Sequence, residues 1–391
     1  MIRVAILGST GSIGRSTLEV IERHPERFDV VALAANQALD ALALQVARHR
    51  PAVAVLGRND GRVNRDDLPP AQWLEGREAL LEIVESPDVD VVVNALVGAA
   101  GLEPTLRTLQ VGKRLALANK ESLVAGGDLV VEAARSGRGE LIPVDSEHSA
   151  ILQCLEGYDM DSVARLVLTA SGGPFRGWTA DGLQDVGPSQ ALDHPTWSMG
   201  AKISVDSATL ANKALEVIEA HFLYGVDYDC LGVVVHPQSI VHSFVEFVDG
   251  SVLAQLGFPT MELPILYALS YPERVEDGAL QTFDPVRASP LDFEEVDRDV
   301  FTLFVLGERA GREGGTSPAV YNAANEVAVE AFLNEEIGFL EMSDVVAASL
   351  HRLGGQPIES LEHVLEVDRE AREVSRELIR SRRDGSHKKK S

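Results

Sequence analysis

The feature that most constrains the fold is a glycine-rich turn near the N-terminus. The apolar run Arg3–Leu7 is followed by Gly8-Ser-Thr-Gly11-Ser-Ile-Gly14, and a helical pattern over residues 16–23 follows at once. Strand, glycine turn and helix in this order form the context of a dinucleotide-binding fingerprint, because glycines let the backbone approach a pyrophosphate at the helix N-terminus. The spacing is G-x-x-G-x-x-G instead of G-x-G-x-x-G, and a glycine-rich turn without a ligand is the alternative interpretation.

Apolar strand-like runs and helical patterns alternate from this turn to residue 145. Strands separated by helices of about 10–15 residues are typical of a parallel sheet with helices on both faces. The sequence therefore predicts an α/β fold whose first domain, residues 1–145, is a Rossmann-like doubly wound sheet. Ligands bind such sheets at the carboxyl ends of the strands. The expected strands after the first are 28–34, 52–56, 89–96, 114–118 and 140–145, and the expected helices include 73–84 and 102–111.

The end of the second expected strand bears on the choice of cofactor. An NAD site has an Asp or Glu about twenty residues after the fingerprint, and its carboxylate binds the ribose 2′-hydroxyl. Here the strand ends in Ala35-Asn36-Gln37, and the nearest acid is Asp40, inside the next expected helix. Because that carboxylate is absent, a 2′-phosphate is not repelled, which favours NADP. Gln37 supplies hydrogen bonds there but no positive charge.

Two carboxylates stand where the last expected strand of this domain passes into a helix. Asp145 and Glu147 lie within the segment LIPVDSEHSAI at 141–151. Residues i and i+2 of an extended segment point to the same side, so both carboxylates are expected to face one spot, an arrangement that suits a hard divalent cation. A solvated acidic loop has the same pattern, and other parts of the chain must decide.

Lysine is scarce, so each lysine outside the C-terminal tail stands out. The sequence has seven lysines, and three of them lie at 388–390. Lys120 follows the strand end at Ala118-Asn119, where a lysine can bind a substrate at the carboxyl edge of the sheet. A surface lysine at the start of a helix is the alternative.

Two segments of the expected second domain, residues 146–270, favour ligand binding. Ser171-Gly-Gly-Pro-Phe175 follows a strand at 165–169 and is rich in backbone donors, which suits an anion. The loop at 193–200 carries Trp197 and a methionine, as lids that close over ligands often do. Packing of these apolar side chains on the core is the alternative.

A single helix is expected over residues 205–219, with Asp206 or Ser207 as its N-cap and with residues 222–225 at its close. Asn212 and Glu216 are four positions apart and share a face, with Lys213 beside them. This group is either a functional cluster or an ordinary solvated face with a salt bridge.

The remaining segments complete the predicted organisation. Strands are expected at 232–235, 239–248 and 251–256, and a hairpin turn joins the last two. They make the second domain an α+β domain with an exposed or dimer-forming sheet. Prolines and acids without periodicity predict a linker at 271–300. Amphipathic helical patterns predict a C-terminal helical bundle at 301–380. Residues 381–391 are expected to be a disordered basic tail without an assigned role.

Composition limits the partners and the compartment. The formal charge of −25 is unfavourable for general nucleic-acid binding, because phosphates would be repelled. No stretch reaches the roughly 18 uncharged apolar residues that span a bilayer, and the N-terminus runs into a strand instead of a signal peptide. We therefore expect a cytoplasmic protein without a membrane partner. Cys154 and Cys230 are far apart, which argues against a structural zinc site and a disulfide.

The acidic, lysine-poor composition also raises the hypothesis of adaptation to concentrated salt. Activity and solubility measured from low to molar salt would contradict it if activity peaked at low ionic strength.

Several motifs together resemble the 1-deoxy-D-xylulose 5-phosphate reductoisomerase family. They occur in order over nearly the whole chain, and several are long, so chance similarity is not credible. The motifs are GSTGSIG at 8–14, NALVGAAGLEPTL at 94–106, LANKESLV at 117–124, PVDSEH at 143–148, SGGPF at 171–175, HPTWSMGAKISVDSATLANKALEVIEA at 194–220, HPQSIVHS at 236–243 and NAANEVAVEAFL at 322–333.

The resemblance implies a metal site and a phosphosugar site. Asp145, Glu147 and Glu216 would be the ligands of Mg²⁺ or Mn²⁺, with Co²⁺ also admissible, and an all-oxygen set suits a hard cation. Lys120 and Ser146, together with Glu147, would contact the sugar chain. The other residues implied to bind the substrate, through its phosphate, from the lid or beside the metal, are Ser171, His194, Ser207, Asn212, Lys213 and Glu216.

The resemblance also implies NADPH as the cofactor. The pyrophosphate would lie at the glycine turn and the adenosine end at the close of the second strand. Asn119 and Glu121 would lie between cofactor and substrate, and Gly200 would contact the cofactor. The implied residues are Thr10, Gly11, Ser12 and Ile13 for the pyrophosphate, Ala35, Asn36 and Gln37 for the adenosine end, and Asn119, Glu121 and Gly200 for the rest.

The implied reaction is the rearrangement and NADPH-dependent reduction of 1-deoxy-D-xylulose 5-phosphate to 2-C-methyl-D-erythritol 4-phosphate, in isoprenoid precursor biosynthesis, by a homodimer. A metal chelated by two vicinal oxygens of the ketose would polarise its carbonyl. Lys120 and Glu147 are the groups implied for proton handling or charge stabilisation. His194, on a lid that excludes water, would be the third catalytic residue.

The chain departs from the family pattern at three places: residues 36–38, residues 260–262 and residue 149. Where the family commonly has Asn-Arg-Asn or Gly-Lys-Asn, this chain has Asn36-Gln37-Ala38 and lacks the cation expected at the 2′-phosphate, which leaves the preference for NADPH over NADH open. The usual Asp-Met-Arg is replaced by Thr260-Met261-Glu262, a change that concerns the nicotinamide-side wall or the dimer contact. Ser149 replaces a common Asn.

Two other functions fit parts of the pattern. A semialdehyde or sugar dehydrogenase with the same plan would not need a metal, so loss of turnover on chelation argues against it. A redox-sensing regulator that binds the dinucleotide would need a basic DNA-binding module, and the helical C-terminus is acidic before its last ten residues.

Overall fold

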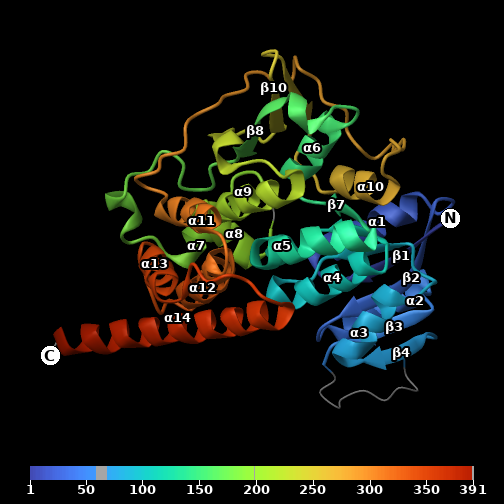
Figure 1. Cartoon of the computed structure of the whole chain (residues 1–391), viewed down its shortest axis with the longest axis horizontal. Helices are drawn as coiled ribbons and strands as arrows, with labels where there is room; N and C mark the ends of the chain where they lie inside the picture. The colour runs from blue at the N-terminus through green and yellow to red at the C-terminus, as the bar shows by residue number, and fades with distance from the viewer. Residues whose placement is uncertain (59–67, 198, 390–391) are drawn as a thin grey trace. The chain divides into compact units, whose positions relative to one another are not determined.

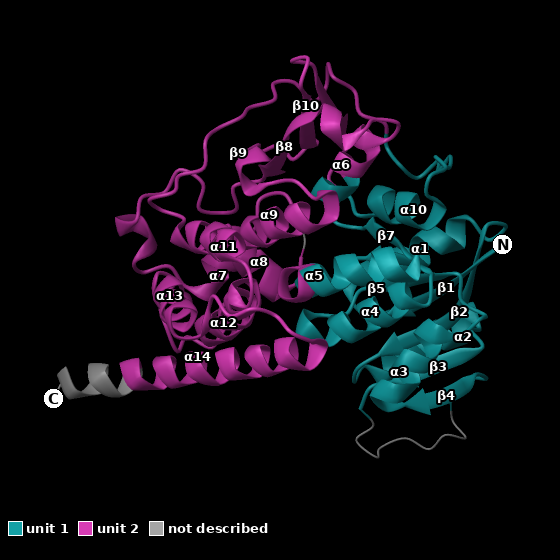
Figure 2. Ribbon diagram, in the orientation of Figure 1, with its two compact units in different colours: residues 1–122, 128–149, 260–281 teal, residues 123–127, 150–259, 282–391 magenta. Residues whose placement is uncertain are grey.

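The computed structural model describes residues 1–58, 68–197 and 199–389, and it forms two compact units (Figure 2). The predicted boundaries divide the chain differently, because residues 260–281 fold with the first unit and the C-terminal helices fold with the second sheet. Unit 1 comprises residues 1–122, 128–149 and 260–281, and unit 2 comprises residues 123–127, 150–259 and 282–391.

Unit 1 contains a seven-stranded sheet in which all neighbouring strands are parallel. Val4–Leu7 of the central strand are fully buried, as expected for a strand covered on both faces. The strand order is β4-β3-β2-β1-β5-β6-β7, so the direction in which strands are added reverses at β1 and creates a switch point there. The predicted doubly wound α/β fold is confirmed. The strands are β1 Ile2–Leu7, β2 Phe28–Ala35, β3 Val53–Leu56, β4 Gln72–Glu75, β5 Val91–Asn94, β6 Arg114–Leu117 and β7 Glu140–Pro143.

Helices connect these strands and cover the sheet. The helix predicted over 73–84 begins only at Gly76, because residues 72–75 pair with β3 as a short edge strand. The helices that begin in this unit are α1 Ser12–Arg23, α2 Leu39–His49, α3 Gly76–Glu85, η2 Gly98–Gly101, α4 Leu102–Gln110, α5 Lys120–Gly137, α6 Ser146–Leu155 and α10 Glu262–Ser270.

Unit 2 contains a four-stranded mixed sheet in the order β11-β10-β8-β9. The strands β8 and β9 are parallel, and β10 is antiparallel to both of its neighbours. An apolar cluster that includes Ile151, Leu168, Ala220 and Val245 joins this sheet to the end of α6 and to α9, so the sheet has one well-covered face. The strands are β8 Val163–Ala170, β9 Leu231–Val235, β10 Val241–Phe247 and β11 Val252–Leu256.

The helices of unit 2 pack around a second apolar core. Tyr321, Phe304 and Phe332 are among its largest fully buried side chains. The helix α14 runs beside α12 and α13 (Figure 1). It continues to Lys389, so the predicted change to an unordered tail at residue 381 does not occur there; the charged helical pattern has no proline to end it. The helices are α7 Pro188–Leu192, α8 Ala201–Ala208, α9 Ala211–Tyr224, α11 Thr302–Glu313, α12 Ser317–Leu333, α13 Glu341–Leu353 and α14 Leu361–Lys389, with short 3₁₀ turns η3 Met160–Ser162, η4 Asp181–Leu183 and η5 Tyr228–Cys230.

The single helix predicted from Asp206 onward is in fact two helices. The backbone of Leu210 adopts a left-handed conformation with φ +56°, which ends α8 and begins α9. The Thr209 hydroxyl supports the joint, because it donates to the carbonyl of Val205 (3.1 Å) and accepts from the backbone N–H of Ala211 (3.3 Å). Asp206 is therefore in the last turn of α8 and is not an N-cap. Leucine carries no sequence signal for such a break, since it is usually helical.

The segment 271–300, predicted as a linker, holds no helix or named strand along its described length. It is tied to the sheet of unit 2 by a bridge between Val235 and Glu294. Its first residues belong to unit 1 and its later ones to unit 2.

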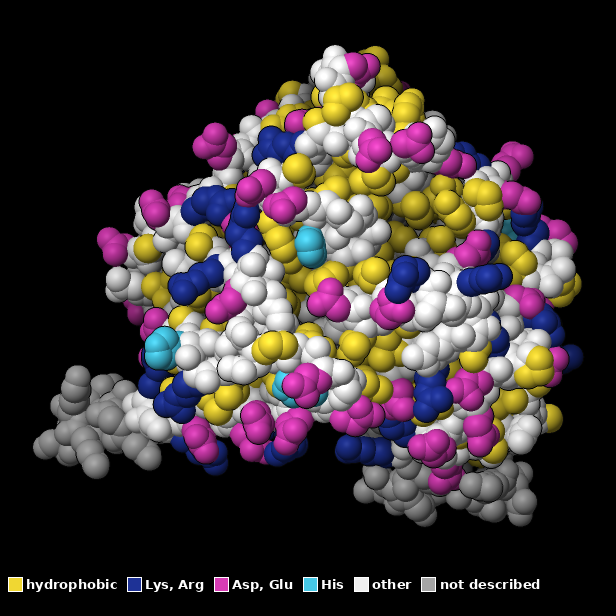
Figure 3. Space-filling view, in the orientation of Figure 1, with side chains coloured by type: hydrophobic (Ala, Val, Ile, Leu, Met, Phe, Trp, Pro, Cys, Tyr) yellow, Lys and Arg dark blue, Asp and Glu magenta, His cyan; other side chains and the backbone are white. Residues whose placement is uncertain are grey.

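The charged side chains of both signs are interspersed over the face shown in Figure 3. Across the described residues, none of the helices combines the length and the apolar content needed to cross a membrane.

A buried polar contact joins α8 to α12 within unit 2. The Asn325 amide donates to Asp206 Oδ1 (2.7 Å), and Lys202 Nζ lies 2.9 Å from Asp206 Oδ2. Asp206 and Asn325 are almost completely buried. A buried carboxylate is costly unless it is paired, so these contacts fix the last turn of α8 and, with it, Ser207.

We expect Asn325→Ala to lower the free energy of unfolding by about 1–3 kcal/mol, because it leaves a buried carboxylate short of a donor. Urea denaturation monitored by circular dichroism measures this change. Asn334→Ala, at the exposed end of the same helix, is the matched control and should shift the midpoint little. Equal effects of the two substitutions would contradict the structural role of Asn325.

Candidate functional site

The glycine turn after β1 is a tight backbone cradle. Gly8 has φ +83°, and a Cβ at this position would come within 2.4 Å of the carbonyl oxygen of Ala95. A Cβ at Gly14 would come within 2.4 Å of the carbonyl oxygen of Gly8. The helix α1 begins at Ser12 with no acidic residue in its first turn. Close backbone approach and a helix N-terminus fit the pyrophosphate of a dinucleotide, so the segment from Thr10 to Ile13 is suited to its predicted role.

The predicted adenosine end lies at the same edge of the sheet. The strand β2 ends at Ala35, which is buried, whereas Asn36 and Gln37 are exposed beyond it. The backbone N–H of Leu39 donates to the carbonyl of Gln37 (2.9 Å) and turns the chain into α2. The carboxyl ends of β1 and β2 are thus adjacent, as dinucleotide binding requires.

Asn119 organises the neighbouring loop. Its amide donates to the carbonyl oxygens of Leu96 (2.9 Å) and Gly98 (3.1 Å) and to Glu121 Oε2 (3.0 Å). Asn119 and Glu121 are both buried. Their contact with a cofactor stays a prediction, and the structure assigns Asn119 a role in shaping the loop. Asn94, which sequence reasoning did not single out, adds hydrogen bonds to Gly101 and Thr105 (both 2.9 Å).

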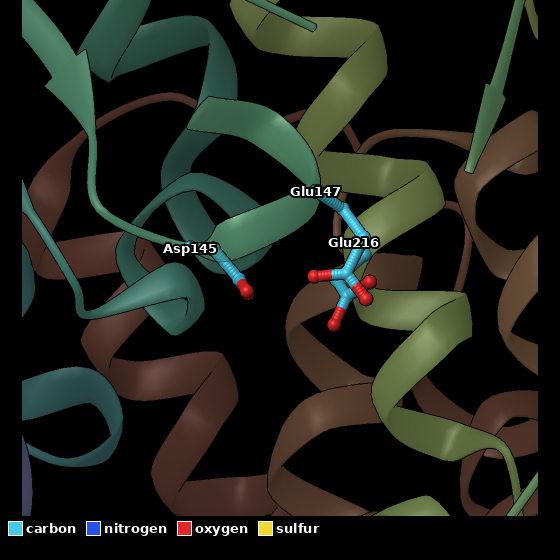
Figure 4. A group of neighbouring side chains, drawn as sticks. All are labelled: Asp145, Glu147 and Glu216. Atoms are coloured by element: carbon cyan, nitrogen blue, oxygen red, sulfur yellow. The ribbon is translucent and has the colours of Figure 1, made fainter. Parts of the chain in front are cut away.

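The paired carboxylates of unit 1 lie at the start of α6 (Figure 4). Asp145 precedes the helix and accepts from the backbone N–H of Ser146 (2.8 Å), while Glu147 is in the first turn and accepts from the Ser146 hydroxyl. Oxygen atoms of the two carboxylates lie within 4.8 Å of each other. The prediction that both face one spot holds, but its stated reason was wrong, because Glu147 is helical and not extended.

Lys120 lies beside this carboxylate pair. Its ammonium group forms an ion pair with Asp145. The side chains of Lys120 and Asp145 are largely buried, so the alternative of a surface lysine is wrong. A lysine and two carboxylates at the carboxyl edge of a parallel sheet can bind a polar substrate and hold protons near it.

Three predicted residues converge in unit 2. His194 Nε2 lies 3.0 Å from the hydroxyl oxygen of Ser171 and 3.1 Å from that of Ser207. The turn after Ser171 packs closely on the end of α8, because a Cβ at Gly173 (φ +64°) would come within 2.6 Å of the carbonyl oxygen of Ser207. Two hydroxyls, an imidazole and a glycine-rich turn form a set of donors suited to an anion.

The tautomer of His194 follows from its surroundings. Its Nδ1 accepts from the backbone N–H groups of Thr196 (3.1 Å) and Trp197 (2.9 Å), so the proton of the neutral ring belongs on Nε2, facing the hydroxyls. Burial lowers the pKa of His194 below its ordinary value, which favours this neutral form. Trp197 and Met199 are half-buried, and movement of their loop as a lid stays a prediction.

The polar group on α9 is buried. Lys213 and Glu216 have only 3% and 1% of their surface exposed. Asn212 and Lys213 both contact the Glu216 carboxylate. The alternative of an ordinary solvated face is therefore wrong, and the group is a functional candidate, because buried charges are retained only with partners or with a role.

Two further predicted positions are placed by the structure. Gly200 is exposed and immediately precedes α8, and nothing in unit 2 assigns it a contact with a cofactor. Glu262, one of the departures from the family pattern, forms an ion pair with Arg23 of α1 (2.7 Å), which also binds Asp277 (2.9 Å). Glu262 therefore helps to fix α10 on α1 within unit 1.

These features together define a dinucleotide-binding α/β enzyme. They are a seven-stranded doubly wound sheet, a glycine cradle at its switch point, and carboxylates and a lysine at its carboxyl edge.

Comparison with known proteins identifies the family within this class. Family models match residues 4–127, described as 1-deoxy-D-xylulose 5-phosphate reductoisomerase, residues 141–224, described as the C-terminal domain of that enzyme, and residues 256–374, described as the DXP reductoisomerase C-terminal domain. The chain belongs to the 1-deoxy-D-xylulose 5-phosphate reductoisomerase family.

Relatives of the same name match nearly the whole chain. The protein of Chlorobaculum tepidum is 49% identical over 381 residues, covering 96% of this chain and 99% of its own. That of Mycobacterium tuberculosis is 51% identical over 381 residues, covering 97% and 91%.

Solved structures of enzymes of this family are similar to this chain in fold. The Zymomonas mobilis enzyme in complex with NADPH has a TM-score of 0.90 and 41% identity over 97% of this chain and 99% of its own. A reductoisomerase in complex with NADPH, fosmidomycin and magnesium has a TM-score of 0.90 and 40% identity, covering 97% and 98%.

The lowered pKa of His194 leads to a prediction about pH. Because the neutral ring accepts two backbone N–H groups, the stability that it contributes should be complete above about pH 6.5, the ordinary pKa of histidine. That contribution should be lost as the pH falls through the lowered pKa. We expect ¹⁵N NMR of labelled histidine to show a ring with its proton on Nε2 and a pKa below 6.5.

The signal is assigned by its disappearance in His194→Ala. His351→Ala, on the exposed face of α13, should leave it in place. A His194 ring that carries its proton on Nδ1 at pH 8 would contradict the assignment.

Proposed function

We propose that this chain catalyses the NADPH-dependent and divalent-metal-dependent conversion of 1-deoxy-D-xylulose 5-phosphate to 2-C-methyl-D-erythritol 4-phosphate, in isoprenoid precursor biosynthesis. The observation that carries the proposal is the oxygen-only pair Asp145 and Glu147 at the carboxyl edge of the sheet, beside Lys120. A dehydrogenase of the same plan that transfers only a hydride would have no need for such a pair. Family membership along nearly the whole chain supports the same reaction.

The metal ligands would be Asp145, Glu147 and Glu216, the three side chains labelled in Figure 4. The donor set fits Mg²⁺ or Mn²⁺, because these hard cations prefer carboxylate oxygens. The Glu216 carboxylate also accepts from the Asn212 amide and the Lys213 ammonium group. When bound, the cation supplies Lewis-acid polarisation of the substrate carbonyl.

The phosphate of the substrate would bind in unit 2. His194 presents an imidazole N–H whose nitrogen lies 3.0 Å from the Ser171 hydroxyl and 3.1 Å from the Ser207 hydroxyl. Asn212 and Lys213 add an amide and a charge on α9. Such a set matches a phosphate dianion, and binding this remote group can supply energy for ordering the reacting carbons.

The reacting part of the substrate would contact residues of unit 1. Lys120 and Ser146 donate hydrogen bonds to its oxygens, and Lys120 stabilises negative charge that develops on them. Glu147 accepts from the Ser146 hydroxyl, so a substrate hydroxyl that enters this network has an acceptor for its proton. Burial of Lys120 and Ser146 strengthens these interactions by excluding water.

The cofactor would lie along the carboxyl edge of the sheet in unit 1. Thr10, Gly11, Ser12 and Ile13 hold the pyrophosphate at the N-terminus of α1. Ala35, Asn36 and Gln37 would bind its adenosine end. Asn119 and Glu121 would lie between cofactor and substrate, and Gly200 would contact the cofactor. When bound, NADPH supplies the hydride that reduces the rearranged aldehyde phosphate.

We propose a cytoplasmic homodimer as the working form. The edge strand β11 exposes Val252 (53%) and Leu253 (38%). An exposed apolar edge strand is commonly covered by another chain, and a second copy would cover it here.

The direct test is incubation of the protein with 1-deoxy-D-xylulose 5-phosphate, Mg²⁺ and NADPH while the absorbance of the reduced nicotinamide is followed. We expect absorbance to fall, to stop falling when EDTA is added, and to resume with excess Mg²⁺ or Mn²⁺. Turnover that persists after chelation would favour the metal-independent dehydrogenase instead.

Glu216→Gln should lower turnover by at least roughly a hundredfold, about 2.7 kcal/mol of transition-state stabilisation, because an amide is a poor ligand for a hard cation. NADPH affinity, measured by nucleotide fluorescence, should be largely kept. Glu219→Gln, also buried on α9, is the control for general disturbance of the helix. Normal turnover of Glu216→Gln would overturn the metal assignment.

A further inference from the structure

The exposed end of β2 carries no positive charge of its own. Asn36, Gln37 and Ala38 are neutral and exposed, and the first charged residue after them is Asp40, in the first turn of α2. A 2′-phosphate placed here would meet a carboxylate in a chain whose formal charge is −25. Binding of NADPH, the cofactor of the proposed function, therefore needs a cation from another element.

The neighbouring strand supplies one. The parallel pairing of β2 and β3 ends with Ala35 opposite Leu56. The backbone continues this ladder, because Gly57 N–H donates to the carbonyl of Ala35 (2.8 Å) and Arg58 N–H donates to the carbonyl of Asn36 (2.8 Å). Arg58 is exposed and is held level with the residues of the adenosine end.

Gly57 makes this close approach possible. A Cβ at residue 57 would come within 2.8 Å of Asn36 Oδ1 and 3.2 Å of Asn36 Cα. Glycine therefore lets the end of β3 lie directly against Asn36. These contacts hold the Arg58 backbone beside the adenosine end.

We infer that Arg58 supplies the positive charge for the 2′-phosphate of NADPH in this chain, in place of a cation at position 37. Its guanidinium forms paired hydrogen bonds with phosphate oxygens more readily than a lysine does. This assignment makes Arg58 a specificity-determining residue that separates NADPH from NADH. It rests on the proposed function only in taking NADPH as the cofactor.

The test is a binding measurement that needs no substrate and no metal. Dissociation constants for NADPH and NADH are obtained from nucleotide fluorescence for the wild type and for Arg58→Gln. We expect NADPH binding to weaken by about tenfold or more, as for loss of a charge-assisted hydrogen bond, and NADH binding to change by less than about twofold. Arg58→Lys should keep part of the preference.

Arg15→Gln is the matched control. Arg15 is also an exposed arginine of unit 1, but it lies in the first turn of α1, at the pyrophosphate end. Because both nucleotides have the pyrophosphate, this substitution should leave the ratio of the two dissociation constants unchanged. Added salt should reduce the NADPH preference of the wild type more than that of Arg58→Gln.

An equal loss of affinity for NADPH and NADH in Arg58→Gln, or no loss for either, would overturn the assignment. A change of the ratio in Arg15→Gln but not in Arg58→Gln would transfer the role to Arg15 and overturn it as well. The outcome is distinguishable from failure of the proposed reaction. A protein that binds NADPH through Arg58 but does not convert 1-deoxy-D-xylulose 5-phosphate would lose the proposed function and keep this assignment.

Discussion

The burial of charge on α9 is the constraint on which unit 2 depends. Removing Lys213 and Glu216 from water costs several kcal/mol per group unless the two are paired, and here they contact each other. The helix is enclosed because α8, α11 and β9 pack around it. The apolar core of these elements thus serves two purposes: it stabilises the unit, and it holds a carboxylate and an ammonium group in a fixed, water-poor setting where their electrostatic effects are strong.

The sequence predicted the central sheet well, because a fully buried parallel strand is a continuous apolar run that differs clearly from an amphipathic helix. It missed β4, whose four residues are only partly buried and pair along one side. It also missed the break at Leu210, since a leucine in a left-handed conformation has no local signal. The surrounding packing imposes that conformation, and packing is a property of distant residues.

In the candidate site, too, some residues could be predicted from local sequence, whereas others depend on distant packing. Asp145, Glu147 and Lys120 were found from their positions at strand ends, because the topology of a parallel sheet brings those ends together. The state of Asn212, Lys213 and Glu216 was left open, because a solvated face and a buried functional face have similar residue types. The elements that pack around α9, namely α8, α11 and β9, decide between them, and no spacing within α9 indicates their presence.

The place of α10 in unit 1 affects the order in which the chain can fold during synthesis. This helix packs on α1, and Glu262 and Asp277 bind Arg23. Domains usually fold as they leave the ribosome, yet here α10 is made only after all seven strands of the first sheet and all four strands of the second. The nascent first unit therefore keeps the side of α1 that contacts α10 uncovered while more than a hundred intervening residues of unit 2 are made, so unit 1 is completed only after the second sheet has been synthesised.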